Sequence, residues 1–257
     1  MAHKRPMTAL ATSTSWPPVE LAATRAMEAR THGTSPNARD AVVGVLTERR
    51  GGLERALEAL AAQPDTLAAV ATVLIKALRA GHKVLVAGNG GSAAEAQHFA
   101  AELVGRFKRE REPYAVIALT ADTAVLTAIA NDYGYADVFA RQVAALARAG
   151  DVLLLFSTSG ESENVVRAAQ AGRQRGVGVM AITGTGQCRL HRLADIAVEA
   201  GEGNAAAVQE VHMIVTHLLC DIVESALVAD AACPPADGDS VAAVAMARPG
   251  VLDGRTL

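Results

Sequence analysis

The chain has 257 residues, of which 24 are lysine or arginine and 27 are aspartate or glutamate, giving a formal net charge of -3 at pH 7. A charge this small sets up no general field that would attract nucleic acid or an anionic membrane, and we expect neither as a partner. Hydrophobic residues form 51% of the sequence, which allows the substantial core of one large domain.

Both ends of the chain are predicted to be flexible extensions. Residues 1–38 contain Ser, Thr, Pro, Gly and Asn without a sustained period, and residues 230–257 are similarly irregular. We expect a single domain between them, over residues 39–229.

The domain is predicted to begin with a helix and to continue as alternating strands and helices. Leucines and valines recur at helical spacing over residues 66–80, with Asp65 as the N-cap and Gly81 as the stop. Five apolar runs of strand length follow, separated by helical segments, at residues 84–87, 115–119, 152–156, 177–182 and 196–198. A long final helix is predicted over residues 205–227. This alternation predicts an α/β fold, a doubly wound, flavodoxin-like parallel sheet with helices on both faces.

A glycine-rich turn follows the first predicted strand. The three glycines of residues 88–91, which we call the glycine turn, let the backbone approach a ligand without a Cβ in the way. Ser92 and Glu95 have the spacing of a capping box, so we expect a helix that begins at Ser92. On that helix His98 and Glu102 lie four residues apart, on one face, where they can converge on a metal or a substrate carbon.

The glycine turn also admits a competing interpretation as a dinucleotide site, because Gly88, Gly90 and Ala93 fit the loose G-x-G-x-x-A form. That site needs an acidic residue at the end of the second strand, about 20 positions later, to hold the ribose. The second predicted strand ends near Thr120, and Asp122 lies well beyond that distance. We therefore favour a different ligand.

A second polar turn follows the third predicted strand. Residues 157–162, which we call the serine loop, offer four hydroxyls beside the N–H groups of a helix that begins near Ser162. Ligands bind at the carboxyl ends of parallel strands, so this loop and the glycine turn should face one crevice. The composition fits a phosphate site, and it also fits an ordinary capped turn.

The predicted final helix carries three polar residues of interest. Gln209 and His217 are eight residues apart, which is about 80° in azimuth at roughly 100° per residue, so both can border one cleft. His212 lies about 140° from His217 on the same geometry and should face a different neighbour. A lone histidine or glutamate on a helix is more often a solvated surface residue. Glu102, however, lies in an apolar stretch where an unpaired carboxylate would be costly.

The three cysteines, Cys188, Cys220 and Cys233, are odd in number and lack the spacing of a metal site, so we expect no disulfide framework. The amino terminus has no apolar segment followed by a small-residue cleavage site. Charged residues interrupt the apolar stretches before they reach the roughly 20 residues of a membrane span. These patterns predict a soluble cytoplasmic protein.

Several segments resemble the signature of the phosphoheptose isomerases, which are sugar isomerase (SIS) domain enzymes. They are Gly88-Asn-Gly-Gly-Ser92 with the following Gln97–Phe107, Asn131-Asp-Tyr-Gly134, Phe156–Ser162 and Gln209–His217. The resemblance runs from about residue 41 to about residue 229, with the motifs in the expected order and spacing. It matches the serine loop to the sugar-phosphate loop of that family.

The resemblance implies a metal site and an acid–base pair. Zinc, or another divalent first-row metal, is held in that family by residues matching His98, Glu102, Gln209 and His217. Glu102 is expected to abstract the carbon-bound proton, and His217 to act as its acid/base partner in an enediol mechanism. Substrate contacts are expected from Asn89, Gly90, Gly91, Ser92, Glu102, Asn131, Asp132, Ser157, Thr158, Ser159, Ser162 and Gln209.

The reaction implied by the resemblance converts D-sedoheptulose 7-phosphate into D-glycero-D-manno-heptose 7-phosphate. The family also implies a homotetramer with sites between subunits, and the helix over residues 66–80 is our candidate packing face. Residues 205–207, all alanine, depart from the family, where many members are expected to have a basic residue. The alternative is a non-catalytic SIS protein, either a sugar-phosphate sensor or a relative of the replication initiator-associating protein. A binding module of that kind needs the phosphate site but no acid–base pair.

Overall fold

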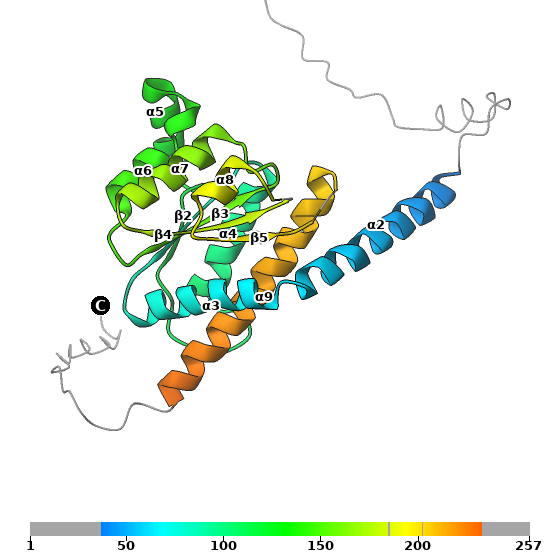
Figure 1. Ribbon diagram of the computed structural model, residues 1–257, viewed down its shortest axis with the longest axis horizontal. Coiled ribbons are helices and arrows are strands. Elements are labelled where there is room, and N and C mark those ends of the chain that lie inside the picture. The colour runs from blue at the N-terminus through cyan, green and yellow to red at the C-terminus, as the bar shows by residue number, and fades with distance from the viewer. Residues whose placement is uncertain (1–36, 185, 202, 233–257) are drawn as a thin grey trace, which may run out of the picture. The chain divides into compact units, whose positions relative to one another are not determined.

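The computed structural model describes residues 37–184, 186–201 and 203–232 (Figure 1). Most of the two expected extensions, residues 1–36 and 233–257, lies outside the described residues. The chain divides into two units at Glu48, which are described separately. In the first unit the described residues form the beginning of helix α2 (Ala38–Ala61), where several apolar side chains are exposed: Val42, Val43, Val45 and Leu46.

The second unit is built on a five-stranded parallel sheet with the strand order β2-β1-β3-β4-β5. The strands are β1 (Val84–Ala87), β2 (Val116–Ala118), β3 (Val152–Ser157), β4 (Gly178–Thr183) and β5 (Ile196–Glu199). Their ends differ from the predicted ends by at most one residue. This order is the flavodoxin-like one, in which the chain reverses its direction of travel across the sheet between β1 and β3. The predicted fold class is confirmed.

Helices cover both faces of this sheet (Figure 1). One face carries α3 (Pro64–Arg79), α4 (Gly91–Val104) and α9 (Ala205–Ala232). The other carries α5 (Thr123–Tyr133), the 3-10 helix η1 (Tyr135–Asp137), α6 (Ala140–Leu146), α7 (Glu163–Gln174) and α8 (Arg189–Leu193). Along β3, Leu154 packs into the first layer and Leu153 and Leu155 into the second, and all three are fully buried. This burial on both faces explains why the strand is continuously apolar rather than alternating.

Helix α3 begins at Pro64, with Gln63 as its N-cap in place of the predicted Asp65. Proline is favourable in the first helical turn because its missing N–H has no partner there in any case. The apolar side of α3, including Val70 and Leu74, is buried in the core of its own unit. Most of the face that we expected to contact other subunits is therefore used inside the domain.

Helix α4 begins at Gly91, with Gly90 as its N-cap and no side chain that caps it. The predicted capping box is wrong. Glu95 is buried and turns to His212 on α9, whose Nδ1 lies 3.2 Å from Oε2 of Glu95. A tertiary partner in the interior has replaced the local one, because a buried carboxylate requires a donor.

Helix α9 is longer than predicted and continues to Ala232, past the expected start of the tail. Within the described part of the chain it is the one helix that is by itself long and apolar enough to cross a membrane. It also packs against α3 and α4 and contributes Val215, Leu219 and Val223 to the core. Its apolar character is accounted for by this packing.

Candidate active site

The glycine turn and the serine loop lie at the carboxyl ends of two adjacent strands. β1 pairs directly with β3, and Ala87, the last residue of β1, is in register with Leu155. Both turns therefore leave the same edge of the sheet, at the position where open α/β sheets bind their ligands. The expectation that they face one crevice agrees with this register.

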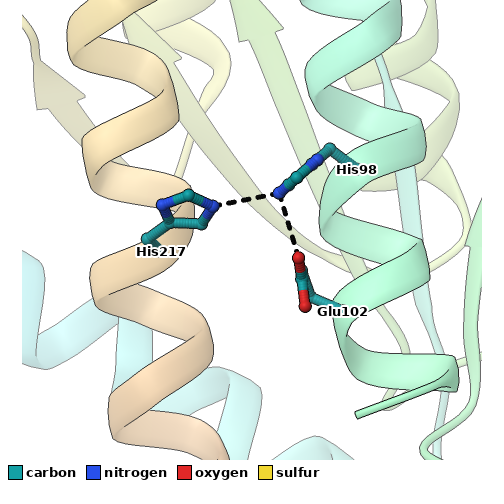
Figure 2. A group of neighbouring side chains, drawn as sticks. All are labelled: His98, Glu102 and His217. Carbon is teal, nitrogen blue, oxygen red and sulfur yellow. Dashed lines mark hydrogen bonds and ion pairs between the residues drawn. The ribbon is translucent and has the colours of Figure 1, made fainter. Parts of the chain in front are cut away.

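Three predicted site residues converge from two helices. His98 and Glu102 project from α4 toward His217 on α9 (Figure 2). The Nε2 atoms of the two histidines lie 3.0 Å apart, and Nε2 of His98 lies 3.1 Å from Oε1 of Glu102. His98 and Glu102 are half-buried and His217 is exposed. We call these three residues the acid–base cluster.

The acid–base cluster has the composition and spacing of a metal site. Its three ligand atoms lie within 4.8 Å of one another. Donor atoms around a tetrahedral zinc ion, with bonds of about 2.0–2.2 Å, are separated by about 3.4 Å. The separations of 3.0 and 3.1 Å are close to that value. Two imidazoles and one carboxylate suit zinc or a similar first-row ion, so the residues present fit the expected metal.

Gln209 and His212 face different surroundings on α9. The carboxamide of Gln209 lies against Gly91, where an added Cβ would displace it. His212 is fully buried, and its ring packs 5.8 Å from the ring of Phe156. The predicted separation of His212 from His217 agrees with this arrangement. Whether Gln209 is a fourth metal ligand stays a prediction.

The serine loop has the form expected of an anion site. Oγ of Ser157 accepts the N–H of Gly160 and Oγ of Ser159 accepts the N–H of Glu161, while Gly160 itself has a φ of +63° that favours glycine. Ser162 is the N-cap of α7, and its side chain makes no capping hydrogen bond. The carbonyl of Thr158 accepts the N–H of Gly184 from the end of β4. These hydrogen bonds hold the loop beside the N-terminus of α7.

Two carboxylates at the end of the serine loop, those of Glu161 and Glu163, have hydrogen-bond partners of their own. Glu163 accepts Nε of Arg167 and Nη1 of Arg189, both within 2.9 Å, and these hydrogen bonds lower the pKa of Glu163. The Glu161 carboxylate accepts the backbone N–H of Arg189 at 2.8 Å. The two acidic side chains therefore have local partners, which reduces their repulsion of a bound phosphate.

The glycine turn is joined to the serine-loop side of the site through side-chain amides. Asn89 and Asn164, in the first turn of α7, exchange two hydrogen bonds of 2.8 Å. The hydroxyl of Tyr135 donates to Oδ1 of Asn89 at 3.0 Å. Asn131 and Asp132 lie at the end of α5, where Nδ2 of Asn131 donates to Oδ1 of Asp132. The sequence analysis missed Asn164 and Tyr135, although Asn164 lies two residues after the serine loop.

A buried carboxylate near the acid–base cluster was also missed. Glu224, on α9, is fully buried and accepts the backbone N–H groups of Phe107, Lys108 and Arg109 at 2.9–3.0 Å. Burial alone would raise the pKa of Glu224, but these N–H groups and the nearby Arg111 guanidinium lower it overall. The ring of Phe107 lies 5.5 Å from the ring of His217, so this loop borders the site.

Arg111 extends the same connection back to α4. Its guanidinium donates to the backbone carbonyls of Glu102, Leu103 and Gly105 at 2.8–2.9 Å. It therefore occupies orphan carbonyls at the carboxyl end of the helix that carries Glu102. The ion-pair distance from Nε of Arg111 to Glu224 is 3.3 Å. Glu224 and Arg111 together attach the end of α4 to α9.

The chain matches a known domain family and named relatives. Residues 51–184 match the SIS domain. A phosphoheptose isomerase of Bradyrhizobium sp. (strain ORS 278) is 47% identical over 188 residues, which cover 72% of this chain and 93% of the relative. One from Helicobacter hepaticus is 51% identical over 155 residues, covering 60% of this chain and 79% of the relative.

Solved structures agree with the sequence relatives. The phosphoheptose isomerase of Neisseria gonorrhoeae is 38% identical with a TM-score of 0.67, and that of Francisella tularensis is 36% identical with a TM-score of 0.69. Each comparison covers 74% of this chain and 100% of the other. The sugar isomerase domain of an RpiR transcription factor from Sphaerobacter thermophilus, 20% identical with a TM-score of 0.51, shares the fold alone. The fold by itself therefore does not separate enzymes from regulators.

Proposed function

The chain belongs to the SIS domain family and, within it, to the phosphoheptose isomerases, and from that membership we propose that it converts D-sedoheptulose 7-phosphate into D-glycero-D-manno-heptose 7-phosphate. The observation that carries this proposal is the convergence of His98, Glu102 and His217 from the facing helices α4 and α9. A protein that only binds a sugar phosphate has no need of such a cluster.

The reaction requires one proton to move between C1 and C2 and another between the oxygens on those carbons. We assign Glu102 as the base that takes the carbon-bound proton, and His217 as the group that exchanges protons with the substrate oxygens or the second carbon. The half-buried position of Glu102 and the exposed position of His217 are compatible with these roles. A base within reach of the carbon, and an acid on the facing helix, can form and collapse an enediol without releasing it.

We further propose that His98, Glu102 and His217, with Gln209 as a fourth ligand, hold zinc or another divalent first-row metal. When bound, such an ion supplies a Lewis acid that polarises the carbonyl and hydroxyl oxygens. The mixture of imidazole nitrogen and carboxylate oxygen and the short distances in the cluster support this assignment. Both roles of Glu102, as a ligand and as a base, depend on the position of α4 relative to α9, because His217 on α9 completes the cluster.

The phosphate of the substrate is assigned to the serine loop. Its four hydroxyls and the N-terminus of α7 offer donors to a dianion. The sugar hydroxyls are assigned to Asn89, Gly90, Gly91 and Ser92, to Asn131 and Asp132, and to Gln209. The contact of Gln209 with Gly91 supports a shared role for the glycine turn and α9.

We propose a cytoplasmic homotetramer as the working form. An apolar groove supports an assembly, since it has a volume of about 390 Å³ and lies between the α2–α3 corner and α9. Leu57 and Ile222, at its border, are 43% and 41% exposed. Apolar side chains at this exposure, gathered in one groove, are typical of a surface that another chain covers.

The proposal is tested by following purified protein with sedoheptulose 7-phosphate by NMR, with zinc, with other divalent ions and after chelation. We expect the aldose 7-phosphate to appear, and to appear faster with added metal. Binding of the sugar phosphate without turnover under all metal conditions would overturn the isomerase assignment and favour the sensor. Equal turnover after rigorous chelation would overturn the metal assignment alone.

A further inference from the structure

Asn89 is held by two side chains that come from different segments of the chain. Its amide and that of Asn164 form a reciprocal pair, each Nδ2 donating to the other Oδ1 at 2.8 Å. The Tyr135 hydroxyl adds a third hydrogen bond, to Oδ1 of Asn89. Asn164 is buried, with 3% of its surface exposed, whereas Tyr135 is 61% exposed. The pair is thus buried at Asn164, and at Asn89 it is hydrogen-bonded to an exposed tyrosine.

These three residues belong to three different segments beside the proposed site. Asn89 belongs to the glycine turn after β1, Asn164 to the first turn of α7 directly behind the serine loop, and Tyr135 to η1. The pairing of β1 with β3 fixes the strands, but it ends at Ala87 and Leu155. Beyond those residues, the Asn89–Asn164 pair links the glycine turn to the start of α7. The pair therefore constrains the distance between the glycine turn and the serine loop, which directly precedes α7.

We propose that Asn164 and Tyr135 are positioning residues that set the distance between the glycine turn and the serine loop, and so select the chain length of the ketose phosphate. This inference rests on the proposed function for its choice of ligand. The phosphate and the reacting carbons are at opposite ends of the substrate. A site that holds its two binding ends at one fixed distance accepts one chain length better than its neighbours.

The geometry explains why the pair is suited to this task. A reciprocal amide pair has two hydrogen bonds, so it resists both sliding and separation more than a single bond does. Three hydrogen bonds on Asn89 leave its carboxamide little freedom to follow a shorter ligand. The Asn164 side chain is joined by hydrogen bonds to Asn89 and to the N–H of Val165, which lie outside the serine loop. Its removal should therefore leave phosphate donors in place.

The test measures affinities in the Glu102→Gln background, where the expected loss of about 10²–10⁴-fold in kcat keeps turnover small during the measurement. Calorimetry compares D-sedoheptulose 7-phosphate, the one-carbon shorter D-fructose 6-phosphate, and inorganic phosphate. We expect Tyr135→Phe and Asn164→Ala each to reduce the preference for the seven-carbon ligand by about three- to tenfold, the usual effect of a lost hydrogen bond. The affinity for inorganic phosphate should be unchanged.

Tyr133→Phe is the matched control, since Tyr133 lies two residues away with its ring against the Arg141 guanidinium. It should leave the preference unchanged. A general loss of folded protein would weaken all three ligands together and leave their ratios intact. Unchanged ratios in folded Tyr135→Phe and Asn164→Ala, or no chain-length preference in the parent background, would overturn the proposal. Failure of the proposed function would appear separately, as an absence of turnover in the protein with Glu102 intact.

Discussion

At the scale of single residues, the proton-transfer roles assigned to Glu102 and His217 can be tested directly. Glu102→Gln and His217→Gln each remove a proton-transfer group with little change in side-chain volume. We expect kcat at saturating metal to fall about 10²–10⁴-fold in each variant, the usual contribution of a general acid or base. Glu110→Gln is the control, because the Glu110 side chain is 93% exposed. A loss below about tenfold in either cluster variant, with an intact circular dichroism spectrum, would remove that residue from the mechanism.

The two histidines of α9 allow a second test. His217→Ala should lose bound zinc, whereas His212→Ala should retain it, because His212 is buried against Glu95 and Phe156. His212→Ala should instead lower the free energy of unfolding by about 2–4 kcal/mol, since it opens a cavity and leaves the Glu95 carboxylate without its partner. Metal analysis per folded chain and denaturant titration measure the two effects. Zinc retained without His217 and lost without His212 would reverse the ligand assignment.

The pair His98 and Glu102 was predicted from a shared helix face, whereas the joining of His217 with His98, 119 residues away, came from the family resemblance. His98 and Glu102 are four residues apart, and the azimuths on α9 separated His217 from His212. Asn164, Tyr135 and Glu224 were missed because their partners are 75, 46 and at least 115 residues away in sequence. No periodicity reports such a pairing. The nearest available signal was Asn164 directly after the serine loop.

At the scale of elements, Glu224 joins the end of α4 to α9 through three backbone N–H groups. Glu224→Gln should lower the free energy of unfolding by about 2 kcal/mol at neutral pH, because hydrogen bonds to a charged acceptor are stronger than those to an amide. The folded-state pKa of Glu224 lies below its ordinary value of 4.5. Its stabilising effect is therefore present above about pH 4.5 and is lost as the pH falls through the folded-state pKa.

Urea titrations of the parent and of Glu224→Gln at several pH values measure this difference. The gap between the two proteins should be constant near neutral pH and should narrow in acid. Asp221→Asn on the same helix is the control, because Asp221 pairs with Lys108 on the exposed surface and should matter less. A gap that widens as the pH falls would contradict the lowered pKa of Glu224.

The serine loop supports a prediction about binding rather than chemistry. Ser157→Ala combined with Ser159→Ala removes two hydroxyls that would face the phosphate, and it also removes the acceptors that hold Gly160 and Glu161. We expect KM to rise at least about tenfold with a smaller change in kcat, since the phosphate is remote from the reacting carbons. Thr72→Ala, an exposed hydroxyl on α3, is the control. Unchanged KM and kcat in the double variant would show that the phosphate binds elsewhere.

Secondary-structure elements were predicted best where burial on both faces of the sheet requires apolar residues. The strands β1, β3 and β4 are buried along almost their whole length, and a parallel strand covered on both faces must be continuously apolar. The edge strands β2 and β5 are partly exposed but are apolar as well. Helix starts were predicted less well, since caps depend on weak local bonds that tertiary contacts replace. Glu95 has the spacing of a capping box, but its carboxylate interacts with His212 on α9 instead. The consequence at the site is that α4 is held to α9 by Glu95 near one end and by Glu224 and Arg111 near the other.

At the scale of the whole molecule, which face contacts other subunits stays a prediction. The periodic apolar side of α3 is needed by its own core, and a sequence pattern cannot say which chain will cover an apolar face. Other apolar residues line the groove, with the exposed Leu57 on α2 and Ile222 on α9 and the partly buried Ile214 and Leu218 between them. His217, the exposed member of the acid–base cluster, directly precedes Leu218, which lines this groove.

The groove therefore provides the test of the proposed tetramer. Ile222→Glu places a carboxylate on a residue that is 41% exposed in the single chain. If a second copy covers the groove, that charge must be desolvated on assembly, at a cost of several kcal/mol. Light scattering should show a smaller species for Ile222→Glu. Leu146→Glu, on α6 outside the groove and 39% exposed, should keep the mass of the parent. If the parent is a monomer, or if Ile222→Glu assembles as the parent does, the groove is not the contact between subunits.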